Sequence, residues 1–446
     1  MMHRTPPSKP RRAGALAAAL LAVWLAPALR AADERKPAGT CVTGDASIVR
    51  RAAPDKPWQI VKQGEKLSTG DLLVGMPGAA IDSADGAVRL ALLSDPDRRS
   101  PYPILEAAVV LHQSPGYDLD FTLDRGRVNL TSQKKDGPAK VRVHFHDQSW
   151  EVTLESAGTV VALQLYGRWA AGVRFNPKPG PRDVPSANLL LLVVKGEARV
   201  KHGGASHFMK APPGPALMHW CNEVGGEAPE PLDSLPAWAD AVRRNTERAK
   251  MLKAAMDKFR KLALEKSLPA AIDQFLASDQ PSERAMAVIF LGATDNMDGL
   301  RKVFHDPKQS DQWDAAVIVL RHWLGRCPGQ DQKLYNRLTA PGRYTPAHAA
   351  TMLQLLHSFG ENDLAHPELY RMLVRYMGHD ALGIRGLAHW HLYRLVPEGQ
   401  SIGFNQLAPK EEREKARAAW QKLIEKKLAA GELPPGRKPP PKKPAK

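Results

Sequence analysis

The chain has 446 residues, of which 43% are hydrophobic and 25% charged, and its formal net charge is +16. This length predicts two or three domains, and the composition is typical of a soluble globular protein. Most of the excess charge lies at the two ends. Five basic residues precede the first acidic residue, Asp33, and residues 431–446 hold five basic residues against one glutamate. The net +7 that remains for the rest of the chain is too dilute to indicate a nucleic-acid-binding surface.

Residues 1–31 have the pattern of a secretory signal peptide. Basic residues 9–12 precede an apolar stretch, 13–29, and small residues follow at Ala31 and Ala32. We expect cleavage after Ala31 and export to the periplasm or cell envelope. The apolar stretch is near the lower length limit for crossing a bilayer, so an uncleaved anchor is the alternative.

The chain contains three cysteines, Cys41, Cys221 and Cys327. The first two stand at the ends of the β domain predicted below, which would suit a disulfide in an oxidising compartment. The alternative, which we favour, is that all three are small buried hydrophobic residues.

Residues 40–221 have the alternation of an all-β domain. Segments 121–130 and 190–200 each alternate apolar and polar residues around one glycine, Gly126 or Gly196. This pattern predicts two strands joined by a tight glycine turn. Segments 141–146 and 150–154 also have period two, and segment 159–165 is rich in β-branched residues.

Several short motifs in this segment occur in a recognisable order. They are Leu67-Ser-Thr-Gly70-Asp71-Leu-Leu, Asp85-Gly86 with Leu90, Leu123-Asp-Arg-Gly126-Arg-Val, and Val194-Lys-Gly196-Glu-Ala-Arg-Val followed by Ala211-Pro-Pro-Gly214. Over residues 40–220 the chain resembles a FecR-like domain.

The resemblance implies a β-sandwich or short β-solenoid that binds a protein or ligand partner outside the cytoplasm. In that family the signal passes through one membrane helix to a segment that binds a sigma factor. Only about a dozen residues, basic in overall charge, precede the apolar stretch here. We therefore expect scaffolding or sensing instead of sigma-factor regulation. Independently of the family, Asp71 and Asp85 adjoin glycines and are expected to bond their own turns and not to act as catalysts.

The composition changes after Trp220. Residues 222–236 are rich in glycine and proline and read as a linker, and residues 237–266 are expected to form a connector helix. Its apolar stripe would suit either a coiled-coil seam between two copies or packing against its own chain, and we favour the second.

Residues 267–430 contain several amphipathic helices of similar length. Four of them place small residues before a bulky apolar face, and aligned on Ala287, Ala316, Ala350 and Ala388 they are 29, 34 and 38 residues apart. This spacing predicts an all-α helical-repeat, α-solenoid-like domain and resembles degenerate HEAT-like repeats. An irregular bundle is the alternative. Residues 431–446 form a Pro/Lys tail that is expected to be extended and disordered.

No motif in the sequence indicates catalysis. His144 with His146 and His389 with His391 lack the spacing of a zinc site, and no phosphate-binding loop or nucleophile motif is present. We therefore predict no enzyme activity, catalytic residue, cofactor or metal. A protein partner is expected on the helical repeats or the β domain, with membrane contact only through an uncleaved leader or the tail; the oligomeric state stays open. The surface expected to bind the partner comprises Arg321, His322, Trp323, His389 and Trp390.

Two other functions are compatible with the sequence. A carbohydrate-acting hydrolase would bring two carboxylates to about 5–9 Å of each other in a pocket. A polysaccharide-binding module would expose a row of aromatic side chains on the β domain, drawn from Trp58, Tyr102, Tyr117, Trp150, Tyr166 and Trp169.

Overall fold

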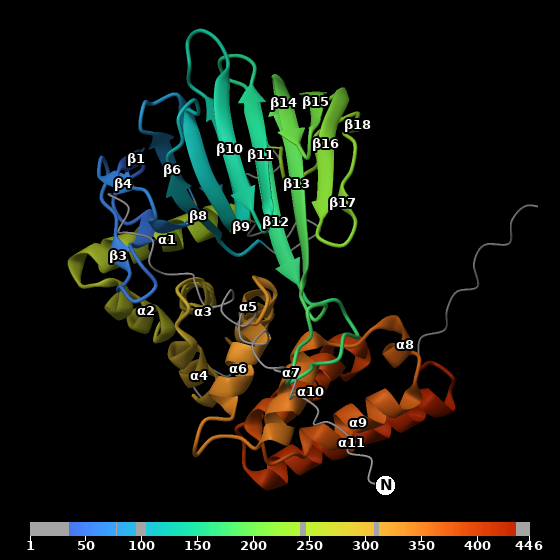
Figure 1. The fold of residues 1–446 in the computed structure, drawn as a ribbon. Helices are drawn as coiled ribbons and strands as arrows, with labels where there is room; N and C mark the ends of the chain where they lie inside the picture. Colours follow the sequence, from blue (N-terminus) through green and yellow to red (C-terminus); the bar gives the residue numbers. More distant parts are fainter. Residues whose placement is uncertain (1–34, 77, 95–103, 241–246, 307–311, 434–446) are drawn as a thin grey trace, which may run out of the picture. The chain divides into compact units, whose positions relative to one another are not determined.

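The computed structural model describes residues 35–76, 78–94, 104–240, 247–306 and 312–433. A large β-sheet region is followed by a helical region, as the sequence predicts (Figure 1). The strands are β1 Pro37–Cys41, β2 Ile48–Arg51, β3 Gln59–Ile60, β4 Lys66–Ser68, β5 Leu72–Gly75, β6 Ala79–Ser83, β7 Val88–Leu93, β8 Ala107–His112, β9 Leu119–Ser132, β10 Ala139–Phe145, β11 Gln148–Leu154, β12 Val160–Arg168, β13 Ser186–Lys195, β14 Glu197–His202, β15 Ala205–Lys210, β16 Gly214–Cys221, β17 Gly225–Gly226 and β18 Glu230–Leu232.

The helices are α1 Glu247–Glu265, α2 Leu268–Leu276, α3 Pro281–Ala293, α4 Met297–His305, α5 Trp313–Gly325, α6 Gln330–Leu338, α7 Pro346–His357, α8 Glu361–Leu364, α9 Pro367–Met377, α10 Leu382–Leu395, the 3₁₀ helix η2 Pro397–Ser401, and α11 Lys410–Ala429. No helix in the described ranges is long and apolar enough to cross a bilayer. The predicted signal peptide, 1–31, and most of the predicted tail lie outside the described residues.

The strands form two sheets, A and B, and β9 belongs to both. Sheet A runs β4-β1-β6-β7-β9-β12-β13-β16, and β17 and β18 both pair with β16. Sheet B runs β3-β2-β5-β8-β9-β10-β11-β14-β15, and within it β9 and β10 are parallel. Inward side chains of both sheets, such as Leu163 from sheet A and Val143 from sheet B, belong to one hydrophobic core. The period-two pattern predicted for β10 and β11 is confirmed by their alternating burial.

The tight turns predicted at Gly126 and Gly196 are not hairpins. In sheet B, β9 pairs with β10 up to Thr122 and with β8 up to Arg125, and in sheet A it pairs with β7 and β12 from Gly126 onward. At Gly196 the chain passes from β13 in sheet A to β14 in sheet B. Both glycines have positive φ, +86° and +76°. A Cβ at Gly126 would stand 2.0 Å from the Glu106 carbonyl oxygen. These glycines therefore let the backbone turn between sheets.

The predicted linker and connector helix differ from the structure in part. Residues 225–226 and 230–232 form strands, and Trp238 and Ala239 pack on the outer side of sheet A against Ala162 and Leu192. This cover explains why β12 is buried on both faces. Helix α1 begins at Glu247, after a gap in the described residues at 241–246.

The helices of the helical region pack against one another in sequence, and α1 packs against α2 and α3. Helices α3 and α5, α5 and α7, and α7 and α10 contact each other in succession, and these four contain the small residues aligned in the sequence. The stripe of α1 packs within the chain, with the Phe259 ring stacked on Phe290 at 4.4 Å and edge-on to Phe275. The preferred interpretation of that stripe, packing against its own chain, agrees with these contacts.

Candidate functional site

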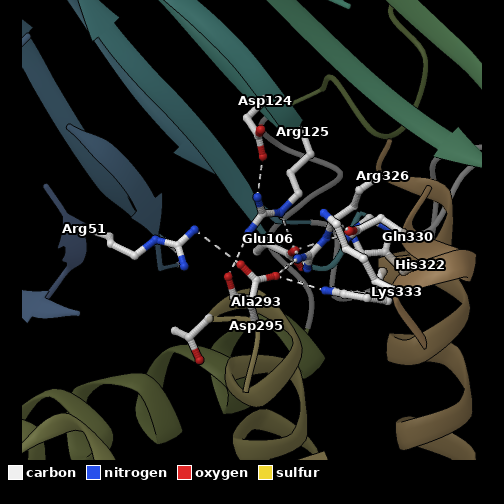
Figure 2. Close-up of polar contacts among 12 residues, drawn as sticks. Arg51, Glu106, Asp124, Arg125, Ala293, Asp295, His322, Arg326, Gln330 and Lys333 are labelled. Carbon is white, nitrogen blue, oxygen red and sulfur yellow. Dashed lines mark hydrogen bonds and ion pairs between the residues drawn. The ribbon is translucent and has the colours of Figure 1, made fainter. Parts of the chain in front are cut away.

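A buried charge cluster joins the β region to the helical region (Figure 2). We call it the Glu106 cluster; it comprises Glu106, Arg125, His322 and Arg326, with Arg51, Asp124 and Asp295 around them. Glu106 stands immediately before β8, and Arg125 lies opposite on β9 at the corner where β9 changes sheets. The close backbone approach at Gly126 therefore places the two side chains together.

Arg125 connects three parts of the chain. Its Nε donates to Glu106 Oε1 at 2.8 Å, and its Nη2 donates to the carbonyl of Ala293, the last residue of α3, at 2.8 Å. Its Nη1 donates to the Asp124 carboxylate. A guanidinium at the C-terminal end of a helix satisfies a free carbonyl and interacts favourably with the helix dipole.

The helical side contributes side chains from the end of α5. Arg326, the residue after α5, donates from Nη2 to the same Glu106 Oε1. His322, one turn earlier, has its Nε2 at 3.4 Å from that oxygen. Glu106, Arg125 and His322 are only 4%, 6% and 3% exposed, so their charges interact with little screening.

Asp295 is the second acceptor of the Glu106 cluster. It lies between α3 and α4 with φ of +57°, a conformation that aspartate tolerates. Its carboxylate accepts from Trp323 Nε1 at 2.9 Å and pairs with Arg326 at 3.3 Å and with Arg51 of β2 at 3.4 Å. Trp58 Nε1 donates to the neighbouring Thr294 carbonyl at 3.0 Å. The loop between α3 and α4 is thus bonded to Arg51 of β2 and to Trp58, which precedes β3.

Burial and charge act in opposite directions on Glu106. Desolvation favours its neutral form, but the guanidinium groups of Arg326 and Arg125 hold the pKa of the carboxyl well below its usual range. Three arginines, Arg51, Arg125 and Arg326, then face three carboxylates, Glu106, Asp124 and Asp295. A proton on His322 would add an unmatched charge.

His322 is held neutral by its surroundings. Burial lowers the pKa of this imidazole, and repulsion from Arg326 and Arg125 lowers it further against the attraction of Glu106. Its ring stacks on Tyr166 of β12 with a centroid distance of 5.8 Å. His322 therefore acts as a packed aromatic contact between the two regions.

A second buried contact lies at the end of α7. The His357 ring stacks on Trp169 at 4.4 Å, and its Nε2 is 3.9 Å from Asp331 Oδ2. Burial lowers the pKa of His357 to about 4 and raises that of Asp331. Nearby, Gln354 accepts from the Phe175 amide at 3.0 Å, and the backbones of Gly172 and Gly360 lie in close approach. The C-terminal ends of α3, α5 and α7 thus each meet the β region.

The Glu106 cluster is suited to holding the β region and the helical region in one orientation. The Glu106 and Asp295 carboxylates each accept hydrogen bonds from more than one donor, and Glu106 is closed to solvent. Breaking one partner would leave a buried charge uncompensated, which is strongly unfavourable. The arrangement is suited to fixing the β region against α3 and α5. Within the described ranges, no group of three or more His, Cys, Asp or Glu residues could hold a metal ion.

The five residues expected to form a partner surface have different environments. His322 and Trp323 are buried in the Glu106 cluster, where they contact Glu106 and Asp295. His389 packs inside the helical region against Phe404 and Trp420. Arg321 and Trp390 alone remain together in a half-buried position, with the guanidinium 5.3 Å from the indole centroid. The sequence alone predicted one surface for all five residues, because it does not show which helix ends are buried against the β region.

The cysteines are free thiols in the structure. Cys41 lies in β1 and Cys221 in β16, with β6, β7, β9, β12 and β13 between them in sheet A. Strand spacing of about 4.8 Å puts the two ends of this sheet far beyond the span of a disulfide. The disulfide considered from the sequence is therefore not formed. Cys41 is buried, Cys221 is half-buried and Cys327 is exposed.

The aromatic residues considered for polysaccharide binding do not form an exposed row where the structure describes them. Trp150, Tyr166 and Trp169 are buried, Trp58 packs against the helical core, and Tyr117 is half-covered by Arg142. Tyr102 lies outside the described residues.

Turn chemistry explains the two glycine-flanking aspartates, as the sequence predicts. Asp71 Oδ2 accepts from the Ser68 amide at 2.8 Å, and Asp85 Oδ1 accepts from the Ala87 amide at 3.0 Å.

No family model, curated protein or solved structure matches this chain. The site must therefore be interpreted from its own geometry.

Sequence reasoning did not single out Glu106, Arg326 or Asp295. One signal was present: Glu106 is an isolated charge inside the apolar stretch 104–111, and Arg125 and Arg127 flank Gly126 within a strand pattern. Charges in such positions indicate buried pairing, because an unpaired buried charge is costly.

Proposed function

We propose that this chain is an exported, non-catalytic interaction protein in which a FecR-like β region and a HEAT-like helical region act as one body. The β region and the helical region would each contribute surface to a scaffold or sensor outside the cytoplasm. The observation that carries the proposal is the Glu106 cluster, because its buried charges fix the orientation of the β region on α3 and α5. A fixed orientation is what presentation of two surfaces to one partner requires.

The FecR-like assignment is supported by the positions of its glycines. Gly70 and Gly86 occupy turns with φ of +80° and +72°, and Gly126 and Gly196 stand where the chain changes sheets. These four motif glycines thus have a backbone conformation that glycine adopts more easily than any other residue.

The HEAT-like assignment is supported by the order of helix packing. The row α3, α5, α7 and α10 has neighbours 29 to 38 residues apart at the aligned alanines, as stacked repeats do. Ala287, Ala316 and Ala388 are fully buried, which permits close approach between successive helices.

Two residues of the expected partner surface, Arg321 of α5 and Trp390 of α10, form an accessible patch with Tyr393 and Arg394 of α10. The guanidinium groups of Arg321 and Arg394 both lie over the Trp390 ring, and Tyr393 is 40% exposed. Aromatic and arginine side chains are the ones that most often dominate binding energy at protein interfaces.

The test is proximity labelling by the full chain in its native cell, comparing the wild type with the double variant Trp390→Ala, Tyr393→Ala. The matched control is Phe208→Ala, which removes a 47% exposed aromatic ring from β15. We expect envelope proteins to be labelled by the wild type and the control, and at least one of them to be lost with the double variant. Mass spectrometry of the mature N-terminus checks export.

Two results would contradict the proposal. One is a mature protein that stays in the cytoplasm with residues 1–31 intact. The other is a labelling pattern that is identical for the wild type, both variants and an unrelated exported protein.

A further inference from the structure

A cavity of about 360 Å³ lies within the helical region, between α4, α5, α6, α7 and α10. Its interior is apolar and comes from all five helices. Among the interior residues are Leu300 of α4, Trp313 and Leu320 of α5, Leu334 of α6, Leu356 of α7 and Leu387 of α10. The volume falls within the range of small-molecule sites. The Glu106 cluster contributes no residue to this lining.

The polar residues of the cavity are basic. Arg301 and His305 come from α4, Arg337 from α6 and Arg343 from the loop before α7, and all four are exposed. No aspartate or glutamate is found among the described residues that line the cavity. An apolar chamber with a positive rim is complementary to a molecule with an apolar body and a negative head.

The positive charge at the rim is only partly neutralised. Arg337 pairs with Asp298, and Arg337, Arg343 and Arg301 together lower the pKa of that carboxyl. Three arginines therefore surround one aspartate. Arg343 donates to the Arg337 carbonyl at 3.2 Å, whereas the Arg301 guanidinium makes no hydrogen bond or ion pair with any residue in the described ranges.

The remaining polar groups of the lining are also donors. Trp313 is 7% exposed, and its indole N–H has no acceptor among the residues that the structure describes. Tyr344 supplies a phenol hydroxyl, which is protonated at neutral pH, and burial raises its pKa further. Arginine, indole and phenol groups together call for a ligand that supplies acceptors.

We propose that this cavity binds a small amphipathic carboxylate, with its carboxylate at Arg301 and Arg343 and its hydrocarbon body among the leucines of α5, α7 and α10. A cavity of about 150 Å³ accommodates a benzene ring, so this one suits a molecule of roughly twelve to fourteen heavy atoms. A medium-chain fatty acid has this size and charge. The inference goes beyond the interaction role proposed above and does not depend on it.

Calorimetric titration of the full chain with decanoate tests the proposal. We expect one binding site, with decanol, which has the same chain and no charge, binding at least about tenfold more weakly. Arg301→Ala and Arg343→Ala should each raise the Kd for decanoate about tenfold, because each removes a charged hydrogen-bond donor. Neither should change the Kd for decanol.

The matched control is Arg375→Ala, an exposed arginine of α9 outside the cavity, which should leave the Kd for decanoate unchanged. All three substitutions are at exposed positions, so folding should be preserved and circular dichroism checks this. The proposal is overturned if decanoate does not bind at millimolar concentration, if decanol binds equally well, or if Arg301→Ala and Arg375→Ala have the same effect.

Discussion

Several histidines in this protein are buried in the neutral form. His389 packs between Phe404 and Trp420, and His391 shares an edge contact with Phe359 while its Nε2 donates to the Leu355 carbonyl at 2.8 Å. Burial lowers the pKa of His357, His389 and His391 to about 4 in each case. These rings serve as aromatic packing groups, and their lowered pKa values make the stability of the folded protein depend on pH.

The folded protein should lose stability as the pH falls below about 6.5. Between about pH 6.5 and pH 4 these three imidazoles are protonated in the unfolded chain and neutral in the folded chain. Each of them therefore lowers the free energy of unfolding by about 1.4 kcal/mol for each pH unit in that range. Urea unfolding at pH 7.5, 6.5 and 5.5 measures the slope. His389→Phe should reduce it by less than about one third, because His322 and other histidines with a lowered pKa also contribute to the slope. The packing control Phe404→Leu should lower the free energy of unfolding equally at every pH. A free energy that is the same at pH 7.5 and 5.5 would contradict the expectation.

At the scale of the element, β9 determines how the two sheets are joined. Its first half belongs to sheet B and its second half to sheet A, and Arg125 and Gly126 stand at the change. Strands that pass between packed sheets need a bend, and residues without a Cβ allow the local backbone to come close. The same step brings Arg125 next to Glu106, so one glycine supports both the fold and the Glu106 cluster.

Gly126→Ala should cost more than about 4 kcal/mol of unfolding free energy. The new Cβ would meet the Glu106 carbonyl oxygen at 2.0 Å and the Ala107 Cα at 2.6 Å, both of which are backbone atoms that cannot rotate away. Gly70→Ala is the matched control, because Gly70 has a similar φ of +80° but no heavy atom within 4 Å of the added Cβ. It should cost only about 1–2 kcal/mol, the backbone strain alone. Equal losses for the two variants in urea unfolding would show that the close approach is unimportant.

At the scale of the whole chain, the ends of α3, α5 and α7 meet the β region in succession. Arg125 binds the end of α3, the backbones of Gly167 and Gly325 approach at the end of α5, and Trp169 stacks on His357 at the end of α7. The C-terminal ends of these three successive helices thus form an interface with the β region within the chain. The Glu106 cluster contributes the charged part of that interface.

Glu106→Gln should destabilise the folded chain by about 3–5 kcal/mol. Two buried guanidinium groups, those of Arg125 and Arg326, would lose their shared carboxylate, and the cost of the unpaired charges should dominate. Urea unfolding measures the loss, and Arg89→Met at the exposed pair with Asp82 is the control, with an expected cost below about 1 kcal/mol.

The pairing itself can be separated from simple loss of packing. The double variant Glu106→Gln, Arg326→Met should cost less than the sum of its single variants, because it removes one charge of each sign. Strict additivity, or a Glu106→Gln variant as stable as the control, would mean that the Glu106 cluster does not hold the two regions together.

The sequence by itself determined the local structure of this protein. Alternation in residues 141–154 specified β10 and β11, glycine beside Asp71 and Asp85 specified turns, and small residues before bulky faces specified the helices that hold Ala287, Ala316, Ala350 and Ala388. Such features depend on neighbouring residues, so a local pattern is sufficient to predict them.

Only the tertiary structure decided which strands share a sheet and which charges share an environment. The Glu106 cluster combines residues that are 19, 168 and 220 positions apart, as in the contacts of Glu106 with Arg125, Arg125 with Ala293, and Arg326 with Glu106. The same holds for Gly126, whose strand continues into another sheet, and for Cys41 and Cys221, which lie at opposite ends of sheet A. Pairing between distant segments depends on the packing of the whole chain, and a local pattern contains no information about it.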